Sequence, residues 1–140
     1  MTNSPGSVFL LAAPADISAT TRGFVRDNPE TVRRYVRSYI EVVQLMKSDR
    51  ETGIKVLAKY LRTIKDRDVL AKTYDGAISD KKFSPKQYPS IPGLQMALDL
   101  LAEENPKAKS AKPEDFVDTR FIKELDQSGY IDGLYKGKGR

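Results

Sequence analysis

Apolar residues recur at every third or fourth position after Asn28, which is the spacing that places side chains on one face of an α-helix. Asn28 is suited to cap this helix, Pro29 to occupy its first position, and Glu30 to face the positive end of its dipole. The apolar positions are Val32, Val36, Tyr39, Ile40, Val43 and Met46. The pattern predicts a helix from Asn28 to about Lys47 with one buried face.

Two more helix starts follow closely in the sequence. Ser48 and Glu51 form the capping box SDRE, and Asp66 is placed to cap a third helix. The apolar residues behind these starts are Ile54, Leu57, Ala58 and Leu61, and then Val69, Leu70, Tyr74 and Ile78. Because the first and second helices are joined so closely, we expect them to pack as a pair that leans toward antiparallel.

Proline-rich segments separate these helices from two later ones. The stretch DKKFSPKQYPSIPG contains three prolines, which exclude a continuous helix and predict an extended tether whose Phe83 and Tyr88 rings bury against the body. A fourth helix is predicted from about Pro92 to Glu104, and NPKAKSAKPEDF is a second tether before a helix capped by Asp118. The buried residues expected in these two helices are Leu94, Leu98, Leu101, Phe121, Ile122 and Leu125.

Strand signals are confined to the N-terminal part of the chain. β-Branched residues between Asp16 and Val25 predict a short strand over part of that stretch, and the apolar run from Val8 to Ala13 predicts a second, buried one. The expected fold class is mainly α with one or two short strands, about five helices and two extended tethers. The expected parts are an N-terminal segment (1–15), a folded region (16–135) and a basic tail (136–140).

The composition excludes several kinds of chemistry. A chain of 140 residues is long enough for one domain with a hydrophobic core. It contains neither cysteine nor histidine, which excludes thiol nucleophiles, imidazole bases, disulfides and nearly all zinc sites. Helix capping and solubility account for its carboxylate pairs, so we expect no catalytic residue, no cofactor and no enzymatic activity. These pairs are Glu103 with Glu104, Glu114 with Asp115, and Asp126 with Asp132.

The run DQSGYID near the C-terminus is similar to half of an EF-hand calcium loop. With Gly129 at the sixth loop position, the twelfth falls on Tyr135, where calcium needs a bidentate glutamate. Glu124, Asp126 and Asp132 are therefore expected to bind no metal. Gly129 is instead predicted to end a helix in the left-handed conformation, with an exit segment behind it. The residues that should hold this exit segment against the body are Tyr130, Ile131, Leu134 and Tyr135.

Positive charge suggests one class of function. The formal net charge is +5, and arginines gather around the start of the first predicted helix, where Arg33 and Arg37 share a face. This stripe leaves open a small basic helical module that binds an acidic partner or nucleic acid. Acidic residues interspersed from Asp27 to Glu51 favour an ordinary solvated face, so nucleic acid is the less favoured partner. No apolar run approaches the roughly 20 residues needed to cross a bilayer.

The order of these segments resembles the C-terminal region of ABC-transporter solute-binding proteins of the nitrate, sulfonate and taurine class, which is related to the thiamine-pyrimidine synthases. The similarity runs from about Ile17 to Tyr135. It includes TTRGF before the NPETV helix start, VLAKYL in the next helix, the tether SPKQYPSIPGLQ, and the closing run KPEDFVDTRFIKELDQSGYIDGLY. The order and spacing of these pieces carry the resemblance.

The resemblance implies the C-terminal portion of a two-lobed α/β fold that closes over a small anionic or heterocyclic solute. It also implies a non-enzymatic protein, a periplasmic or extracellular location, and an ABC-transporter permease as partner. The related synthase activity is not expected, because it consumes an active-site histidine. Family members are longer than this chain, and the parts that hold most of their solute-gripping residues have no counterpart here.

Ser18, Thr20 and Thr21 are the positions that the resemblance places near a solute, and ordinary strand hydroxyls are their alternative interpretation. We therefore expect solute binding only when the other lobe is supplied. Association with a separate chain that supplies this lobe, or self-association, is a further expectation. No lysine or arginine precedes Arg22, so the apolar run at the N-terminus is not expected to act as a signal peptide.

Overall fold

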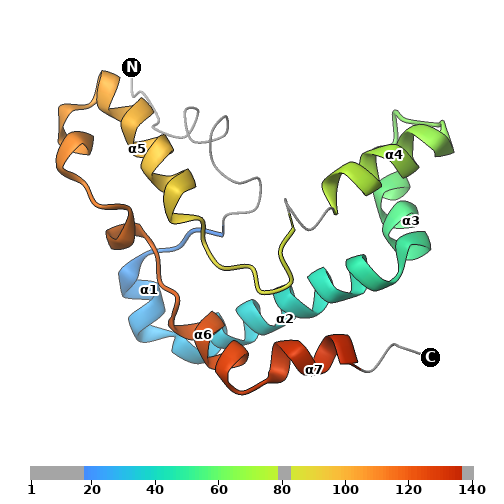
Figure 1. Ribbon diagram of the computed structural model, residues 1–140, viewed down its shortest axis with the longest axis horizontal. Helices are drawn as coiled ribbons and strands as arrows, with labels where there is room; N and C mark the ends of the chain where they lie inside the picture. The colour runs from blue at the N-terminus through green and yellow to red at the C-terminus, as the bar shows by residue number, and fades with distance from the viewer. Residues whose placement is uncertain (1–17, 79–82, 137–140) are drawn as a thin grey trace. The chain divides into compact units, whose positions relative to one another are not determined.

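The computed structural model describes residues 18–78 and 83–136, and every regular element within those ranges is helical (Figure 1). This confirms the predicted mainly α fold. The α-helices are α1 (Arg22–Asp27), α2 (Pro29–Ser48), α3 (Arg50–Tyr60), α4 (Arg67–Ala77), α5 (Ile91–Glu104), α6 (Arg120–Gln127) and α7 (Tyr130–Lys136), and the 3₁₀ helices are η1 (Pro106–Ser110) and η2 (Pro113–Phe116).

The chain divides into two compact units. The larger, here called the α2 unit, comprises Phe24–Tyr88 and Arg120–Arg140 and contains α2, α3, α4, α6 and α7. The smaller, here called the α5 unit, comprises Met1–Gly23 and Pro89–Thr119 and contains α5, η1 and η2. Each unit has buried side chains of its own.

The boundary between α2 and α3 is a single residue. Asp49 ends α2 and caps α3, where its carboxylate accepts a hydrogen bond from the Thr52 amide at 3.0 Å. The predicted cap, Ser48, is the last residue of α2 instead, and its hydroxyl donates to the Leu45 carbonyl at 3.3 Å. The capping prediction was therefore wrong by one residue, because Ser48 is engaged by the preceding turn of its own helix.

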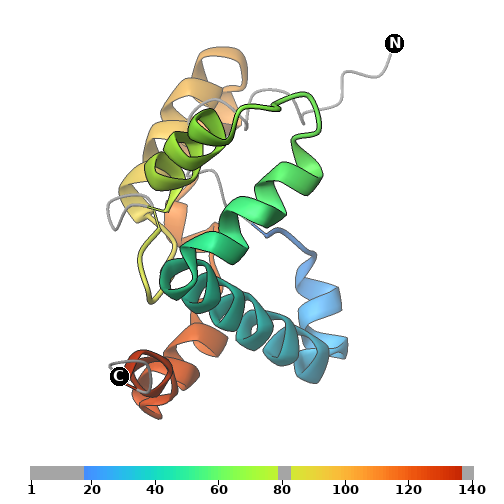
Figure 2. The same ribbon diagram turned by 90° about the vertical axis from the view of Figure 1, so that its right-hand side faces the viewer.

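The packing of α3 on α2 is less close than predicted. α3 turns upward from the end of α2 in Figure 1 and forms a V with it in Figure 2, rather than lying along it. A one-residue connection is shorter than the two to five residues that typically join antiparallel helices. The helix that pairs closely with α3 is α4.

Two hydrophobic clusters form the core of the α2 unit. The first joins α2, α6 and α7 through Ile40, Ile122 and Ile131. The second joins α3 and α4 through Ile54, Leu70 and Tyr74. Residues from α2 take part in both, because Val36 packs against the first cluster and Met46 against the second. The long helix α2 is thus the common support of the unit.

The C-terminal end of α6 has the predicted glycine stop. Gly129 has a φ of +74°, and its amide donates to the Asp126 carbonyl at 3.0 Å. The segment after it is not an irregular exit but the helix α7. Docking of this segment is confirmed, since Ile131 is 1% exposed and Leu134 and Tyr135 pack against the same cluster.

The α5 unit is built on one helix and two short 3₁₀ turns. Ser90 caps α5 by accepting a hydrogen bond from the Gly93 amide at 3.1 Å. The predicted second tether is not extended throughout, because η1 and η2 form within it and pack against α5. Arg22 adds a contact inside the unit by donating from Nη2 to the Asp115 carbonyl at 2.7 Å. The buried residues of the unit are Leu94, Ala97, Leu98, Ala108 and Pro113.

The strand predicted within Asp16–Val25 is wrong for the part that the structure describes. Residues 18–21 have no regular structure, and Arg22–Asp27 is the helix α1. A strand needs a neighbour to satisfy its backbone hydrogen bonds, and residues 18–78 and 83–136 contain none. A short helix satisfies part of its backbone locally. The strand expected at Val8–Ala13, and nearly all of the expected tail, lie outside the described residues.

Three side-chain predictions also need correction. Val69 was expected inward on α4 but is 45% exposed, because α4 turns the Leu70 and Tyr74 side toward α3. In the first tether, Phe83 is half-buried as expected, but Tyr88 is exposed and is held by its hydroxyl rather than by its ring. The helix that Asp118 was expected to cap begins at Arg120, one residue later than that assignment requires.

Candidate functional site

The residues expected to contact a solute lie just before α1. Ser18, Thr20 and Thr21 are exposed and belong to the α5 unit. None of them lies on a strand, so the alternative interpretation as strand hydroxyls has no support in this segment. Their contact with a solute stays a prediction.

Arg33 and Arg37, which form the arginine stripe on α2, bind carboxylates of the protein itself. Arg33 donates from Nε to the two carboxylate oxygens of Glu124 at 3.0 and 3.2 Å, and it also pairs with Glu30. Arg37 donates from Nε to Glu41 at 3.0 Å and lies 4.7 Å from the centre of the Tyr130 ring. These two same-face arginines therefore hold α6 and α7 on α2, and the nucleic-acid hypothesis gains no support from them.

Tyr130 completes this contact between α2 and α7. Its hydroxyl donates to Glu41 and accepts a hydrogen bond from Arg37 Nε at 3.0 Å. The hydrogen bond from Tyr130, followed by that from Arg37, lowers the pKa of Glu41. Burial, followed by the bond to Glu41, raises the pKa of Tyr130. Both shifts favour a charged carboxylate beside a neutral phenol, which is a stable packing arrangement rather than a reactive one.

Asp126, in the DQSGYID run, anchors the first tether. The Lys86 ammonium lies 2.6 Å from its carboxylate, and the Tyr88 hydroxyl donates to it at 2.9 Å. These contacts, led by that with Lys86, lower the pKa of Asp126. Asp132 lies 3.9 Å from the same ammonium. Both carboxylates of the DQSGYID run thus lie close to the Lys86 ammonium.

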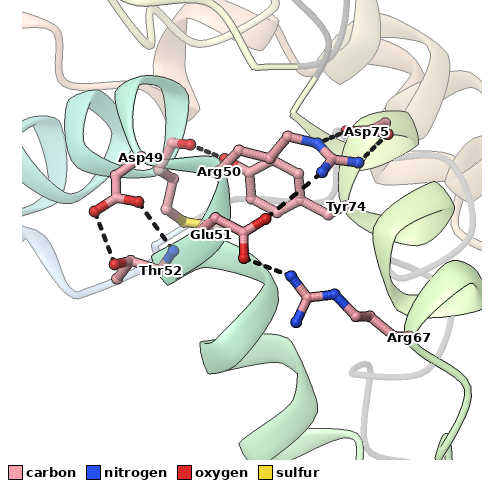
Figure 3. Close-up of polar contacts among 8 residues, drawn as sticks. Asp49, Arg50, Glu51, Thr52, Arg67, Tyr74 and Asp75 are labelled. Atoms are coloured by element: carbon pink, nitrogen blue, oxygen red, sulfur yellow. Dashed lines mark hydrogen bonds and ion pairs between the residues drawn. The ribbon is translucent and has the colours of Figure 1, made fainter.

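A further group of polar contacts joins the beginning of α3 to both ends of α4 (Figure 3). Arg50 donates from Nε and Nη2 to the two carboxylate oxygens of Asp75, both at 2.8 Å, and lowers the pKa of that carboxyl. Glu51 accepts from Arg67 at 2.5 Å. Between them the buried Tyr74 ring points its hydroxyl at the Met46 carbonyl. All these groups are partnered, and the arrangement fixes the angle between the two helices.

The lowered pKa values predict a stability that depends on pH. A carboxyl whose pKa is lower in the folded than in the unfolded protein stabilises the fold when the pH is above its unfolded pKa, which is about 4. This contribution is lost as the pH falls through the pKa that the carboxyl has in the folded protein. We expect Asp75→Asn and Asp126→Asn to lower the melting temperature near about pH 7, and the difference from wild type to close near about pH 3. Thermal unfolding followed by circular dichroism at both pH values measures this.

Glu104→Gln is the matched control, because Glu104 is exposed at the end of α5 and forms no ion pair among the described residues. Its melting temperature should follow that of the wild type at both pH values. Parallel pH curves for all four proteins would contradict the assigned ion pairs.

No three carboxylates within residues 18–78 and 83–136 lie close enough together to hold a metal ion. Of the carboxylate pairs, Glu103 and Glu104 are the last residues of α5, and Glu114 and Asp115 lie in η2.

Sequence reasoning missed a second set of cations, which lies in the second half of α3 and just after it. Lys55, Lys59, Arg62 and Lys65 are all exposed, and none has a carboxylate partner among the described residues. Their sequence signal was present, because no acidic residue occurs between Thr52 and Lys65. It was hidden by the denser arginine stripe on α2.

No helix in the described ranges is long and apolar enough to span a membrane. No protein-family model, curated protein or solved structure matches this chain.

Proposed function

We propose that this chain is the helical, C-terminal portion of a solute-binding protein of an ABC importer, similar to the nitrate, sulfonate and taurine class. In this proposal the protein is non-enzymatic and its ligand is a small anionic or heterocyclic solute. A permease is its partner, and the location is periplasmic or extracellular. The observation that carries the proposal is that the segments of the resemblance coincide with the boundaries of successive helices.

These coincidences occur at four places along the chain. NPETV begins α2, with Pro29 in the first turn, and VLAKYL forms the end of α3. SPKQYPSIPG leads into α5 through its cap at Ser90. SGYIDGLY contains the glycine stop of α6 and nearly all of α7. The motifs therefore follow one another in the same order as the helices whose boundaries they mark.

The apolar surface of α5 supports the same proposal. Leu94 and Leu98 are buried inside the α5 unit, yet Met96 and Leu100 on another side of the helix are 57% and 44% exposed. A helix that is apolar on several sides is typical of one covered on more than one side. In an α/β lobe, helices of this kind cover a sheet. We therefore assign the strands of the proposed lobe to a polypeptide segment outside the described residues or to another chain.

The proposal predicts that the chain alone binds solute weakly. Exposed hydroxyls at Ser18, Thr20 and Thr21 form at most one wall of a site, and a one-sided site cannot exclude water from its ligand. Isothermal titration with nitrate, taurine, alkanesulfonates and aromatic carboxylates should show no binding tighter than about millimolar. Micromolar binding of any of them would refute the need for a second lobe.

A chimaera tests whether this chain supports solute binding when the other lobe is supplied. Residues 18–136 replace the C-terminal region of a solute-binding protein of the resembled class, and the solute affinity of the chimaera is measured by titration. We expect it to fold and to keep micromolar affinity. Thr20→Val with Thr21→Val should weaken binding at least about tenfold, since each change removes a hydrogen-bonding hydroxyl.

Thr63→Val is the matched control, because Thr63 lies in the connection between α3 and α4 and no solute contact is assigned to it. It should leave the affinity of the chimaera unchanged. A chimaera that unfolds while its parent stays folded, or one that folds without solute binding, counts against the proposed family.

A further inference from the structure

One exposed surface at the end of α3 combines cations with apolar side chains. It is called here the α3 basic surface, and its residues are Lys55, Val56, Lys59, Tyr60, Arg62 and Lys65. All six are exposed. Tyr60 is 74% exposed and Val56 45%, so neither side chain contributes to a core of the α2 unit.

Helical spacing brings the four residues of this surface that lie in α3 together, and Arg62 and Lys65 follow in the connection to α4. Lys55 and Lys59 are four positions apart, as are Val56 and Tyr60, so each pair lies on one side of the helix. The opposite side carries Ile54, which is buried against α4. The Lys59 ammonium lies 5.9 Å from the centre of the Tyr60 ring. The result is an aromatic and an aliphatic side chain next to a row of cations.

The charge of this surface is not neutralised within the described residues. Arg33, Arg37 and Lys86 have carboxylate partners, whereas the four cations of the α3 basic surface have none there. Of the acids that flank this segment in the sequence, Glu51 pairs with Arg67, and Asp66 accepts hydrogen bonds from the first amides of α4. A concentrated positive potential therefore remains at this end of the α2 unit.

Helix capping accounts for only part of the arrangement. Arg62 donates from Nε to the Lys59 carbonyl at 3.4 Å, and cations favour the negative end of a helix dipole. Capping does not require Lys55, which lies more than a turn before the end of α3. It also does not require an aromatic ring that faces solvent, since burying Tyr60 would be more favourable.

We propose that the α3 basic surface binds the anionic headgroups of a phospholipid bilayer. A bilayer offers negative charge across a whole plane, so it needs no matching shape, and the cations of this surface suffice for attraction. It also offers an apolar layer just below the headgroups, where Tyr60 and Val56 can insert while the lysine ammonium groups stay among the phosphates.

Other anionic partners fit this surface less well. A nucleic acid strand is gripped by several aromatic rings that stack on successive bases, and this surface has one. An acidic protein partner requires a specific complementary shape, which two exposed apolar side chains on a convex helix do not provide. The inference concerns a surface that the proposed solute site does not use, and it stands independently of the proposed function.

Vesicle sedimentation with the full 140-residue chain tests the inference. We expect binding to vesicles of phosphatidylglycerol and phosphatidylcholine in about equal parts, and none to pure phosphatidylcholine. Binding should fall at least about tenfold between about 50 mM and about 200 mM salt. The variant K55Q/K59Q/R62Q/K65Q should lose at least about tenfold in partition coefficient, and Tyr60→Ser should lose a smaller factor that persists at high salt.

The variant K72Q/K107Q/K109Q/K112Q is the matched control, because it also lowers the formal net charge of +5 by four but leaves the α3 basic surface intact. It should retain binding within about threefold. Circular dichroism of each variant verifies that its helices remain. No binding of wild type to the anionic vesicles, or equal losses in the two quadruple variants, overturns the inference. Capture by immobilised polyglutamate without vesicle binding also overturns it, in favour of an acidic protein partner.

Discussion

Substitution of Gly53 by alanine should destabilise the α2 unit by about 1–3 kcal/mol, although alanine favours a helix over glycine by about 1 kcal/mol. A Cβ atom at this position would lie 2.1 Å from Cε2 and 2.8 Å from Cζ of Tyr74. The ring cannot move aside easily, because Tyr74 is buried and its hydroxyl donates to the Met46 carbonyl. Urea unfolding followed by circular dichroism measures the loss.

Gly76 provides the control for this prediction within the adjacent helix. A Cβ atom added there meets nothing within 4 Å, so Gly76→Ala should stabilise the protein by up to about 1 kcal/mol. In the double variant Gly53→Ala with Tyr74→Ala, the cost of the Gly53 change should largely disappear, because the clash is with the removed ring. Equal effects of the Gly53 and Gly76 substitutions would show that α3 and α4 do not pack as described.

Truncation of Ile131 to alanine should cost about 2–5 kcal/mol. Ile131 is 1% exposed and packs with Ile40 and Ile122, so its loss leaves a cavity where α7 meets α2 and α6. Because α7 has only seven residues, it cannot stay helical without this contact. We expect a lower urea midpoint and early cleavage within α7 by a protease.

Leu45→Ala is the matched control for this truncation, since Leu45 lies on α2 but is exposed. It should cost less than about 1 kcal/mol, because little apolar contact is lost. If both substitutions lower the urea midpoint equally, α7 does not depend on Ile131 for its attachment.

Much of the helical fold could be predicted because its signals are local. Asp66 caps α4 through its own carboxylate, and Gly129 ends α6 with a left-handed φ, and both properties belong to a few neighbouring residues. The strand at Asp16–Val25 was predicted wrongly because strand propensity depends on a neighbouring strand, which a local pattern does not reveal. The helix α7 was missed for a related reason, since it is stabilised by Ile40 on a distant segment.

The candidate sites were harder to predict, because a charge acquires its role from partners that are remote in the sequence. Arg33 looked available from its own helix, yet it pairs with Glu124, 91 positions away. Lys55 lies one helical turn after Glu51 in the sequence, but in the structure that carboxylate pairs with Arg67 instead. Surface charge can be counted from a sequence, but its neutralisation is a property of the fold.

The packing of α6 and α7 on α2 has a consequence for how the chain is made. The contacts of Arg33 with Glu124 and of Arg37 with Tyr130 join positions 91 and 93 residues apart, so they close late in folding. During synthesis, α2 leaves the ribosome long before its covering helices do, and Ile40 then faces solvent. While translation continues, the apolar face of α2 around Ile40 is uncovered, and it becomes buried only when α6 and α7 pack on it.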